Sequence, residues 1–171
     1  MFKNSTKEKR PRVEIRRSFI EMLFELGAII GVIVSLIIPI KAWSSLPNKI
    51  PAHYNMTGQV DRWGSKYEIF ILVIAIVLIY FLMTLSSRYP HRFNYLIDIT
   101  EQNAEAQYHL VRLMVQVLKA EVIWILVYIQ WISVKGAMGK GMGLGTAFLS
   151  ISLLLVFGTI GVYIWRSFRV K

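Results

Sequence analysis

Residues 46–66 read LPNKIPAHYNMTGQVDRWGSK, and this polar, aromatic and turn-rich stretch decides how the rest of the chain is interpreted. It lies between two apolar segments, Phe19–Ile40 and Ile69–Leu85, that are each long enough to enter a bilayer. A membrane helix needs about 17–25 predominantly apolar residues to cross the hydrocarbon core. The stretch is therefore predicted to be a loop between two spans, and loops on a rigid scaffold carry much of protein function.

Composition also indicates a membrane protein. The chain has 171 residues, of which 55% are hydrophobic, and its mean hydropathy is +0.50. Its formal charge of +10 would suggest nucleic acid in a soluble protein, but no basic and aromatic platform stands outside the apolar segments. We therefore expect the lipid bilayer as partner and no nucleic acid. The chain has no cysteine, which excludes disulfides and thiolate metal sites.

Two more apolar segments predict a third and a fourth span. Residues 117–134 would continue a helix that begins near Glu101 with Thr100 as its N-cap, and residues 144–165 form the last span. Spans in lipid must be helical here, because the hydrocarbon offers the backbone no other hydrogen-bond partner. The predicted fold is an all-α integral membrane protein with four transmembrane helices, a structured first extracellular loop (41–68) and a cytoplasmic loop (86–109).

The distribution of basic residues predicts the orientation. Residues 1–18 form a basic, mobile arm, ahead of a four-helix membrane domain at 19–171. Twelve Lys and Arg residues lie in this arm, after the second span and at the C-terminus, against six in the two opposite loops. Both termini should therefore be cytoplasmic, in a multi-pass protein of the cell membrane. A cleaved signal peptide is the alternative for the first span, but Ala42-Trp43-Ser44 is a poor cleavage site.

The loop itself suggests three kinds of site. Gly58 favours a tight turn at residues 55–58, which would bring His53 back toward Asp61. An imidazole and a carboxylate could then share a metal ion or a proton, and the sequence leaves open whether a metal binds. The second interpretation is a compact cap with purely structural contacts. The third is recognition of a peptide or lipid headgroup through exposed aromatic and charged side chains: Tyr54, Arg62, Trp63 and Lys66.

One buried pair and two glycine pairs are expected among the helices. Glu25 and Lys119 lie near the inner ends of the first and third spans, and a structural ion pair between them would reduce the cost of burying each charge. A proton or ion relay through these two residues is the alternative. Gly27 with Gly31, and Gly141 with Gly145, would permit close helix contact within the protein or in a homo-oligomer.

The loop also resembles the signature of a bacterial membrane domain family of unknown function, which forms the N-terminal part of the Sdp immunity protein. The matching residues are Leu46, Pro47, Ile50, Pro51, His53, Tyr54, Asn55, Gly58, Asp61, Trp63 and Lys66. A second part of the pattern matches Phe93-Asn94-Tyr95, Ile99-Thr100-Glu101, Asn103, Tyr108, Leu110 and Leu118-Lys119, so that the resemblance covers residues 20–135. The immunity relative implies protection of a cell from a secreted sporulation-delaying toxin.

The leading expectation is a non-enzymatic membrane protein of immunity or sensor type, with a peptide toxin or another membrane protein as partner and no cofactor. Its outward loop would recognise a membrane-active peptide or an envelope ligand through His53, Tyr54, Asn55, Asp61, Trp63 and Lys66. One alternative is a metal-assisted or acid/base enzyme on an envelope substrate, with His53 and Asp61 as the reacting pair. Another is a helper subunit of a transporter that docks through the glycine pairs.

Overall fold

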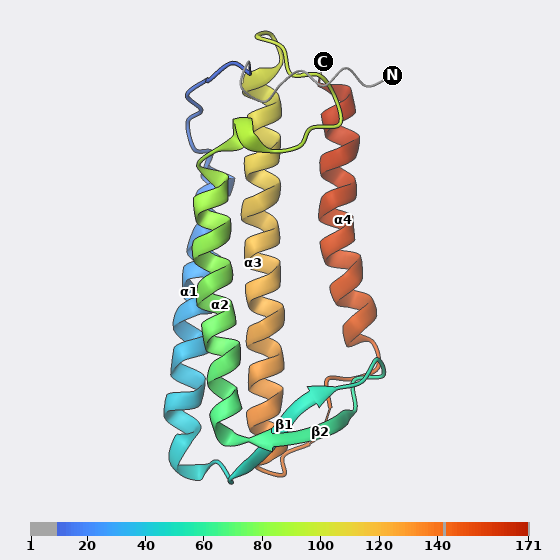
Figure 1. Ribbon diagram of the computed structural model, residues 1–171. Helices are drawn as coiled ribbons and strands as arrows, with labels where there is room; N and C mark the ends of the chain where they lie inside the picture. The colour runs from blue at the N-terminus through green and yellow to red at the C-terminus, as the bar shows by residue number, and fades with distance from the viewer. Residues whose placement is uncertain (1–9, 142, 171) are drawn as a thin grey trace.

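The structure, a computed structural model, describes residues 10–141 and 143–170. This part of the chain is mostly helical, and its four α-helices are α1 (Phe19–Ala42), α2 (Ile69–Ser87), α3 (Ala104–Ala137) and α4 (Phe148–Arg169). The first three pack together, and α4 runs beside α3 (Figure 1). Three of these four helices, α1, α2 and α4, are long and apolar enough to cross a membrane.

Helix α1 combines a strong start signal with a face of small side chains. The Ser18 hydroxyl accepts from the backbone N–H of Glu21, while the Glu21 carboxylate accepts from the backbone N–H of Ser18. This reciprocal capping satisfies two donors that the first turn leaves free. The small buried residues of α1 are Ala28, Gly31, Ser35 and Ala42. A Cβ on Gly31 would lie 2.5 Å from the Ile123 side chain, so that glycine permits the close approach of α1 to α3.

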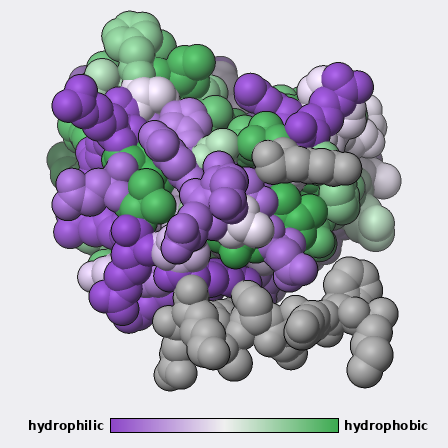
Figure 2. Space-filling view, turned by 90° about the horizontal axis from the view of Figure 1, so that it is seen from above, coloured by the Kyte–Doolittle hydropathy of each residue, from purple (hydrophilic) through white to green (hydrophobic). Residues whose placement is uncertain are grey.

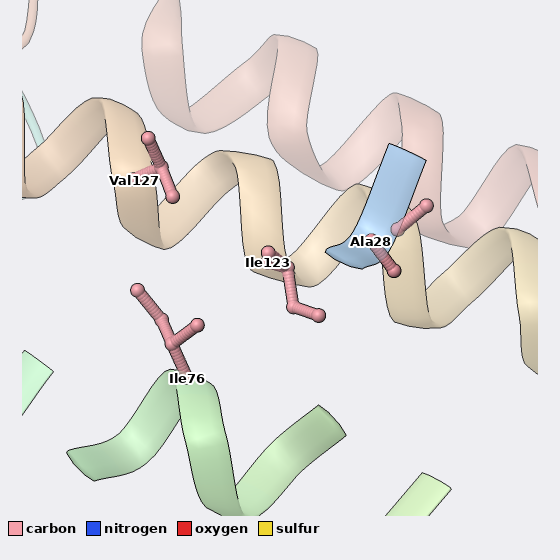
Figure 3. Packing of buried hydrophobic residues seen from close by; sticks show 5 residues of the cluster. Ala28, Ile76, Ile123 and Val127 are labelled. Atoms are coloured by element: carbon pink, nitrogen blue, oxygen red, sulfur yellow. The ribbon is translucent and has the colours of Figure 1, made fainter. Parts of the chain in front are cut away.

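Two apolar clusters hold the three packed helices together. The first fills the middle of the bundle with Ala28, Ile76, Ala120, Ile123 and Val127, from α1, α2 and α3 (Figure 3). The second lies where the helices meet the hairpin and contains Ala42, Leu46, Ile50, Ile69 and Val134. By contrast, many large apolar side chains on the outer faces of α1, α2 and α4 are exposed, as expected of surfaces that face lipid tails.

Two helices begin later than the sequence predicts. Helix α3 starts at Ala104, and Thr100 lies one turn earlier, where its Oγ1 accepts from the backbone N–H of Asn103. Helix α4 starts at Phe148 because Gly143 and Gly145 have φ angles of +102° and +89°, which a right-handed helix cannot contain. The predicted start of the last span at residue 144 therefore falls in the loop that precedes α4.

The expectation of an all-α protein missed a two-stranded sheet. Strands β1 (Lys49–Tyr54) and β2 (Val60–Ser65) form an antiparallel hairpin within the predicted outward loop. An isolated hairpin is marginally stable in water, so packing on other elements must hold it. Ile50 and Pro51 are buried, and strand β1 contacts α3.

The described part of the basic arm, residues 10–18, lies against the protein rather than extending freely from it. The Tyr108 hydroxyl donates to the Pro11 carbonyl, and the Arg112 guanidinium donates to the carbonyls of Ile15 and Arg16. Gln107 donates to the Val170 carbonyl, which places the end of α4 beside the start of α3. The predictions for residues 1–9 and Lys171 lie outside the described residues.

Candidate functional site

The turn of the hairpin is built by the side chain of one residue. Asn55 Oδ1 accepts from the backbone N–H groups of Thr57 and Gln59, each at 3.0 Å, and the backbone N–H of Gly58 donates to the Asn55 carbonyl at 2.9 Å. Gly58 has a φ of +77°, a conformation that glycine adopts without steric cost. The predicted turn at residues 55–58 is present, and the side-chain oxygen of Asn55 organises it.

The turn brings His53 and Asp61 together. Their Nδ1 and Oδ1 atoms are 2.6 Å apart, although the Cα partner of His53 across the hairpin is Arg62. The strand pairing is irregular on both sides of His53, and such bulges re-aim side chains. When Nδ1 donates to Asp61, Nε2 keeps a lone pair that can accept a proton or a hydrogen bond.

Exposure indicates that this pair contributes little to stability. The His53 side chain is 63% exposed and that of Asp61 is 41% exposed. Ion pairs in such surroundings contribute about 0–1 kcal/mol, because water screens them. The pair is therefore better placed to contact a ligand than to hold the hairpin together.

A groove adjoins the pair. It has a volume of about 600 Å³ and runs between the hairpin, α3 and the start of α4. Its hairpin side carries His53, Tyr54, Asn55, Met56, Gly58 and Asp61, and its apolar side carries Ile129, Leu144, Phe148 and Leu149. A polar, histidine-bearing rim over an apolar floor matches the chemistry of an amphipathic ligand.

The tip of the hairpin docks on the glycine-rich loop before α4. The backbone N–H of Leu144 donates to the Gly58 carbonyl at 2.7 Å. A Cβ on Gly58 would lie 2.6 Å from the Gly145 carbonyl oxygen, and a Cβ on Gly143 would lie 2.7 Å from the Gly58 carbonyl oxygen. Only glycine fits at both places. The hairpin turn and the glycine-rich loop before α4 therefore meet and close one side of the groove.

Tyr54 fastens the other side of the hairpin to α3. Its hydroxyl lies 3.0 Å from the Ser133 hydroxyl, and burial raises the pKa of the Tyr54 phenol even though the hydrogen bond to Ser133 opposes that change. Tyr54 therefore stays neutral at physiological pH. It lines the groove but is mainly a link between β1 and α3.

The remaining two predicted site residues lie away from the groove. Lys66 Nζ is 4.5 Å from the centre of the Trp43 ring, which itself packs on Tyr67 and Phe70. Trp63 is exposed on β2 opposite Pro51. The six residues predicted to bind a ligand thus separate into a group at the groove, a structural cation–π contact and an exposed tryptophan.

The apolar side of the groove is the part that sequence reasoning missed. Ile129, Leu144 and Phe148 come from α3, the glycine-rich loop and α4. Each sits in an apolar or glycine-rich segment, where no local pattern distinguishes a groove residue from a lipid-facing one. The run of glycines before α4 was the one available signal in the sequence, and in the structure their positive φ angles fold this loop back toward the hairpin.

The polar pairs inside the bundle lie at the opposite end of the molecule. Lys119 Nζ lies 2.7 Å from Glu25 Oε2 and 2.9 Å from Thr84 Oγ1, and the Tyr80 hydroxyl donates to Glu25 Oε1 at 2.8 Å. The structure thus brings Glu25 and Lys119 together. In a second ion pair, Arg112 Nε lies 2.6 Å from Glu21 Oε1. The sequence did not predict this pair.

Comparisons with known proteins find similarity over only part of the chain. The model of a domain of unknown function (DUF1648) matches residues 30–84, which contain the second half of α1, the whole hairpin and most of α2. An uncharacterized protein of Archaeoglobus fulgidus is 30% identical over 74 residues, which covers 39% of this chain and 40% of that protein. The chain therefore spans less than half the length of this relative. No solved structure matches the chain significantly.

The match includes the hairpin and its His53–Asp61 pair, so this part of the chain is similar to a domain family whose function is unknown. The resemblance to the Sdp immunity protein stays a prediction.

Proposed function

We propose that the chain spans a membrane four times, with α3 crossing in addition to α1, α2 and α4. At about 1.5 Å per residue, its 34 residues extend over about 51 Å, more than the hydrocarbon thickness of about 30 Å. Charged side chains make α3 less apolar than its neighbours, but Arg112 and Lys119 are paired with glutamates of α1. Paired charges that face the interior of a bundle are tolerated in a membrane.

In this arrangement the end that carries residue 10 and residue 170 is cytoplasmic. Hydrophilic side chains gather on that end (Figure 2), and the basic residues that determine the orientation concentrate there. The hairpin and the groove then face the outside of the cell membrane.

Single cysteines test this orientation, since the chain has none of its own. Thr57→Cys, at the hairpin tip, is expected to react in intact cells with a thiol reagent that cannot cross the membrane. Asp98→Cys, in the loop before α3, is expected to react only after the membrane is opened. Labelling of both positions from outside, or the reverse pattern, contradicts the proposed orientation.

We further propose that the protein is a non-enzymatic membrane protein that recognises a membrane-active peptide or an envelope ligand at the groove. The exposed His53–Asp61 pair over an apolar floor carries the proposal. A membrane-active peptide is amphipathic, so its polar face would meet the pair and its apolar face would meet Phe148 and Leu149. The resemblance to the immunity protein supports a toxin peptide as this ligand.

Replacing Asp61 tests this function. In a sensitive bacterium that is challenged with a sporulation-delaying toxin peptide, the natural chain is expected to protect and Asp61→Ala is expected to protect about tenfold less or not at all, since a lost charge-assisted contact is worth about 1.5–3 kcal/mol. Asp98→Ala removes an exposed acidic residue far from the groove and should leave protection intact.

Membrane levels of all variants are compared by immunoblot. Equal protection by Asp61→Ala and the natural chain would remove the pair from the site. No protection by the natural chain would remove this toxin as the ligand.

Acid/base or metal-assisted catalysis is the second candidate, and the 2.6 Å contact between His53 and Asp61 is the observation that favours it. A positioned His–Asp pair can move a proton during a reaction. Within the described residues, no third His, Asp or Glu joins the pair to form a metal-binding group. Metal analysis of the purified protein, compared between the natural chain and His53→Ala, tests the metal-assisted form of this candidate.

A further inference from the structure

A polar cavity lies at the end of the bundle opposite the groove. It has a volume of about 560 Å³ and opens between the basic arm, α1, the end of α2 and α3. Its charged lining residues are Glu14, Arg17, Glu21, Glu25, Arg88 and Arg112. The function proposed above does not use this cavity.

Two of these arginines are available to bind an anion. Glu21 is occupied by Arg112, and Glu25 by Lys119. Within residues 10–141 and 143–170, neither Arg17 nor Arg88 forms an ion pair, and Glu14 is the remaining unpaired acid of the lining. The free groups therefore carry a surplus of positive charge.

The two arginines lie at the same depth relative to the bilayer, each at the end of a helix. Arg17 comes two residues before the first residue of α1, and Arg88 directly follows the last residue of α2. In the four-span arrangement proposed above, both guanidinium groups lie where the hydrocarbon core meets the cytoplasmic headgroups. Guanidinium groups bind phosphate through two parallel hydrogen bonds, which makes arginine well suited to this level.

One strip of the cavity wall is apolar. Met22, Leu26 and Ile29 line it at i, i+4 and i+7 on one face of α1, and all three side chains are exposed. These side chains form a strip that leads from the charged mouth toward the middle of α1. A hydrocarbon chain fits such a strip, whereas a free anion gains nothing from it.

A buried amide adds a polar contact deeper in the cavity. Gln116 is only 5% exposed, and its Oε1 has no hydrogen-bond partner within the described part of the chain. Its Nε2 lies 3.5 Å from the Ser87 hydroxyl. An unpartnered buried acceptor is costly, so it indicates a missing donor such as a hydroxyl group.

We propose that this cavity binds an anionic phospholipid, with the phosphate between Arg17 and Arg88 and an acyl chain along Met22, Leu26 and Ile29. The proposal rests on the four-span arrangement but not on ligand recognition at the groove. The site would hold the basic arm and the cytoplasmic ends of α1 and α2 to the inner leaflet.

Native mass spectrometry of the full chain in detergent, titrated with phosphatidylglycerol, tests the site. We expect one tightly held phosphatidylglycerol on the natural chain and a loss of about tenfold or more in its affinity in Arg17→Gln/Arg88→Gln, at about 1 kcal/mol per basic residue near lipid headgroups. Arg166→Gln/Arg169→Gln removes the same charge from α4 at the same end of the molecule and should keep the affinity. Thermal unfolding verifies that both double variants are folded.

The other results would each overturn the proposal. Equal losses of phosphatidylglycerol affinity in the two double variants would show that the lipid is attracted diffusely to a basic surface. Equal binding of phosphatidylcholine would show that the negative charge of the lipid does not matter for binding. Equal binding of inorganic phosphate would show that the acyl chain does not matter. The absence of tightly bound phosphatidylglycerol on the natural chain would remove the site. None of these outcomes depends on protection against the toxin. The proposal for the cavity and the proposal for the groove are therefore tested independently.

Discussion

Lys119→Met is expected to lower the free energy of unfolding by about 3–5 kcal/mol, the usual cost of breaking a buried ion pair from one side. Lys119 is fully buried, and its Nζ contacts both Glu25 and Thr84. Methionine fills much of the same volume but leaves the Glu25 carboxylate without its cation. Unfolding of the purified protein in mixed micelles, followed by circular dichroism, measures the loss.

Two further variants isolate the electrostatic cause. In Lys119→Met/Glu25→Gln the carboxylate is gone, yet the amide oxygen can still accept from the Tyr80 hydroxyl, so most of the stability should return. Lys135→Met makes the same change near the other end of α3, where Lys135 stacks on the Trp131 ring and is not fully buried, and should cost far less. If the single variant is as stable as the natural chain, the pair does not hold α1 to α3.

Gly58→Ala is expected to detach the hairpin tip from the glycine-rich loop and to open the groove. Alanine at a φ of +77° costs about 1–2 kcal/mol in backbone strain alone. Its Cβ would also lie 2.6 Å from the Gly145 carbonyl oxygen, and a backbone atom cannot rotate away. We expect faster proteolysis of residues 49–65 and a lower unfolding temperature. We also expect the variant to lose its protection of cells against the toxin peptide.

Gly139→Ala is the matched control. Gly139 also has a positive φ, +70°, but a Cβ there meets nothing within 4 Å. This variant therefore carries the strain without the collision, and the difference between the two variants measures the docking of the tip. Equal behaviour of the two variants would contradict the contact between the hairpin and the loop.

Local signals in the sequence predicted the helices well, because hydrophobic length and charge are properties of continuous segments. The start of α1 at Phe19 and of α2 at Ile69 matches the prediction, since Ser18 and the polar loop mark these boundaries directly. The start of α4 was predicted too early, because the hydrophobic Leu144 gave no sign that its glycine neighbours adopt left-handed conformations.

Within the predicted site, the sequence identified the turn and the partners that it brings together. Asn55 and Gly58 form that turn, and they bring His53 to Asp61 over eight residues, a distance that local rules can reach. The position of Lys66 over Trp43 could not be read in this way, because that contact depends on how the end of α1 meets the start of α2.

The sequence by itself determined the apolar helices, the charge asymmetry, the turn and the pairing of Glu25 with Lys119, since each follows from residue type, spacing and the cost of an unpaired charge in lipid. Only the tertiary structure decided that the loop is a hairpin, that its tip rests on Gly143 and Gly145, and that α4 supplies the floor of the groove. The contact of the tip with the loop before α4 joins segments more than 80 residues apart, and what selects it is close packing of backbone on backbone, which no local pattern of side chains encodes.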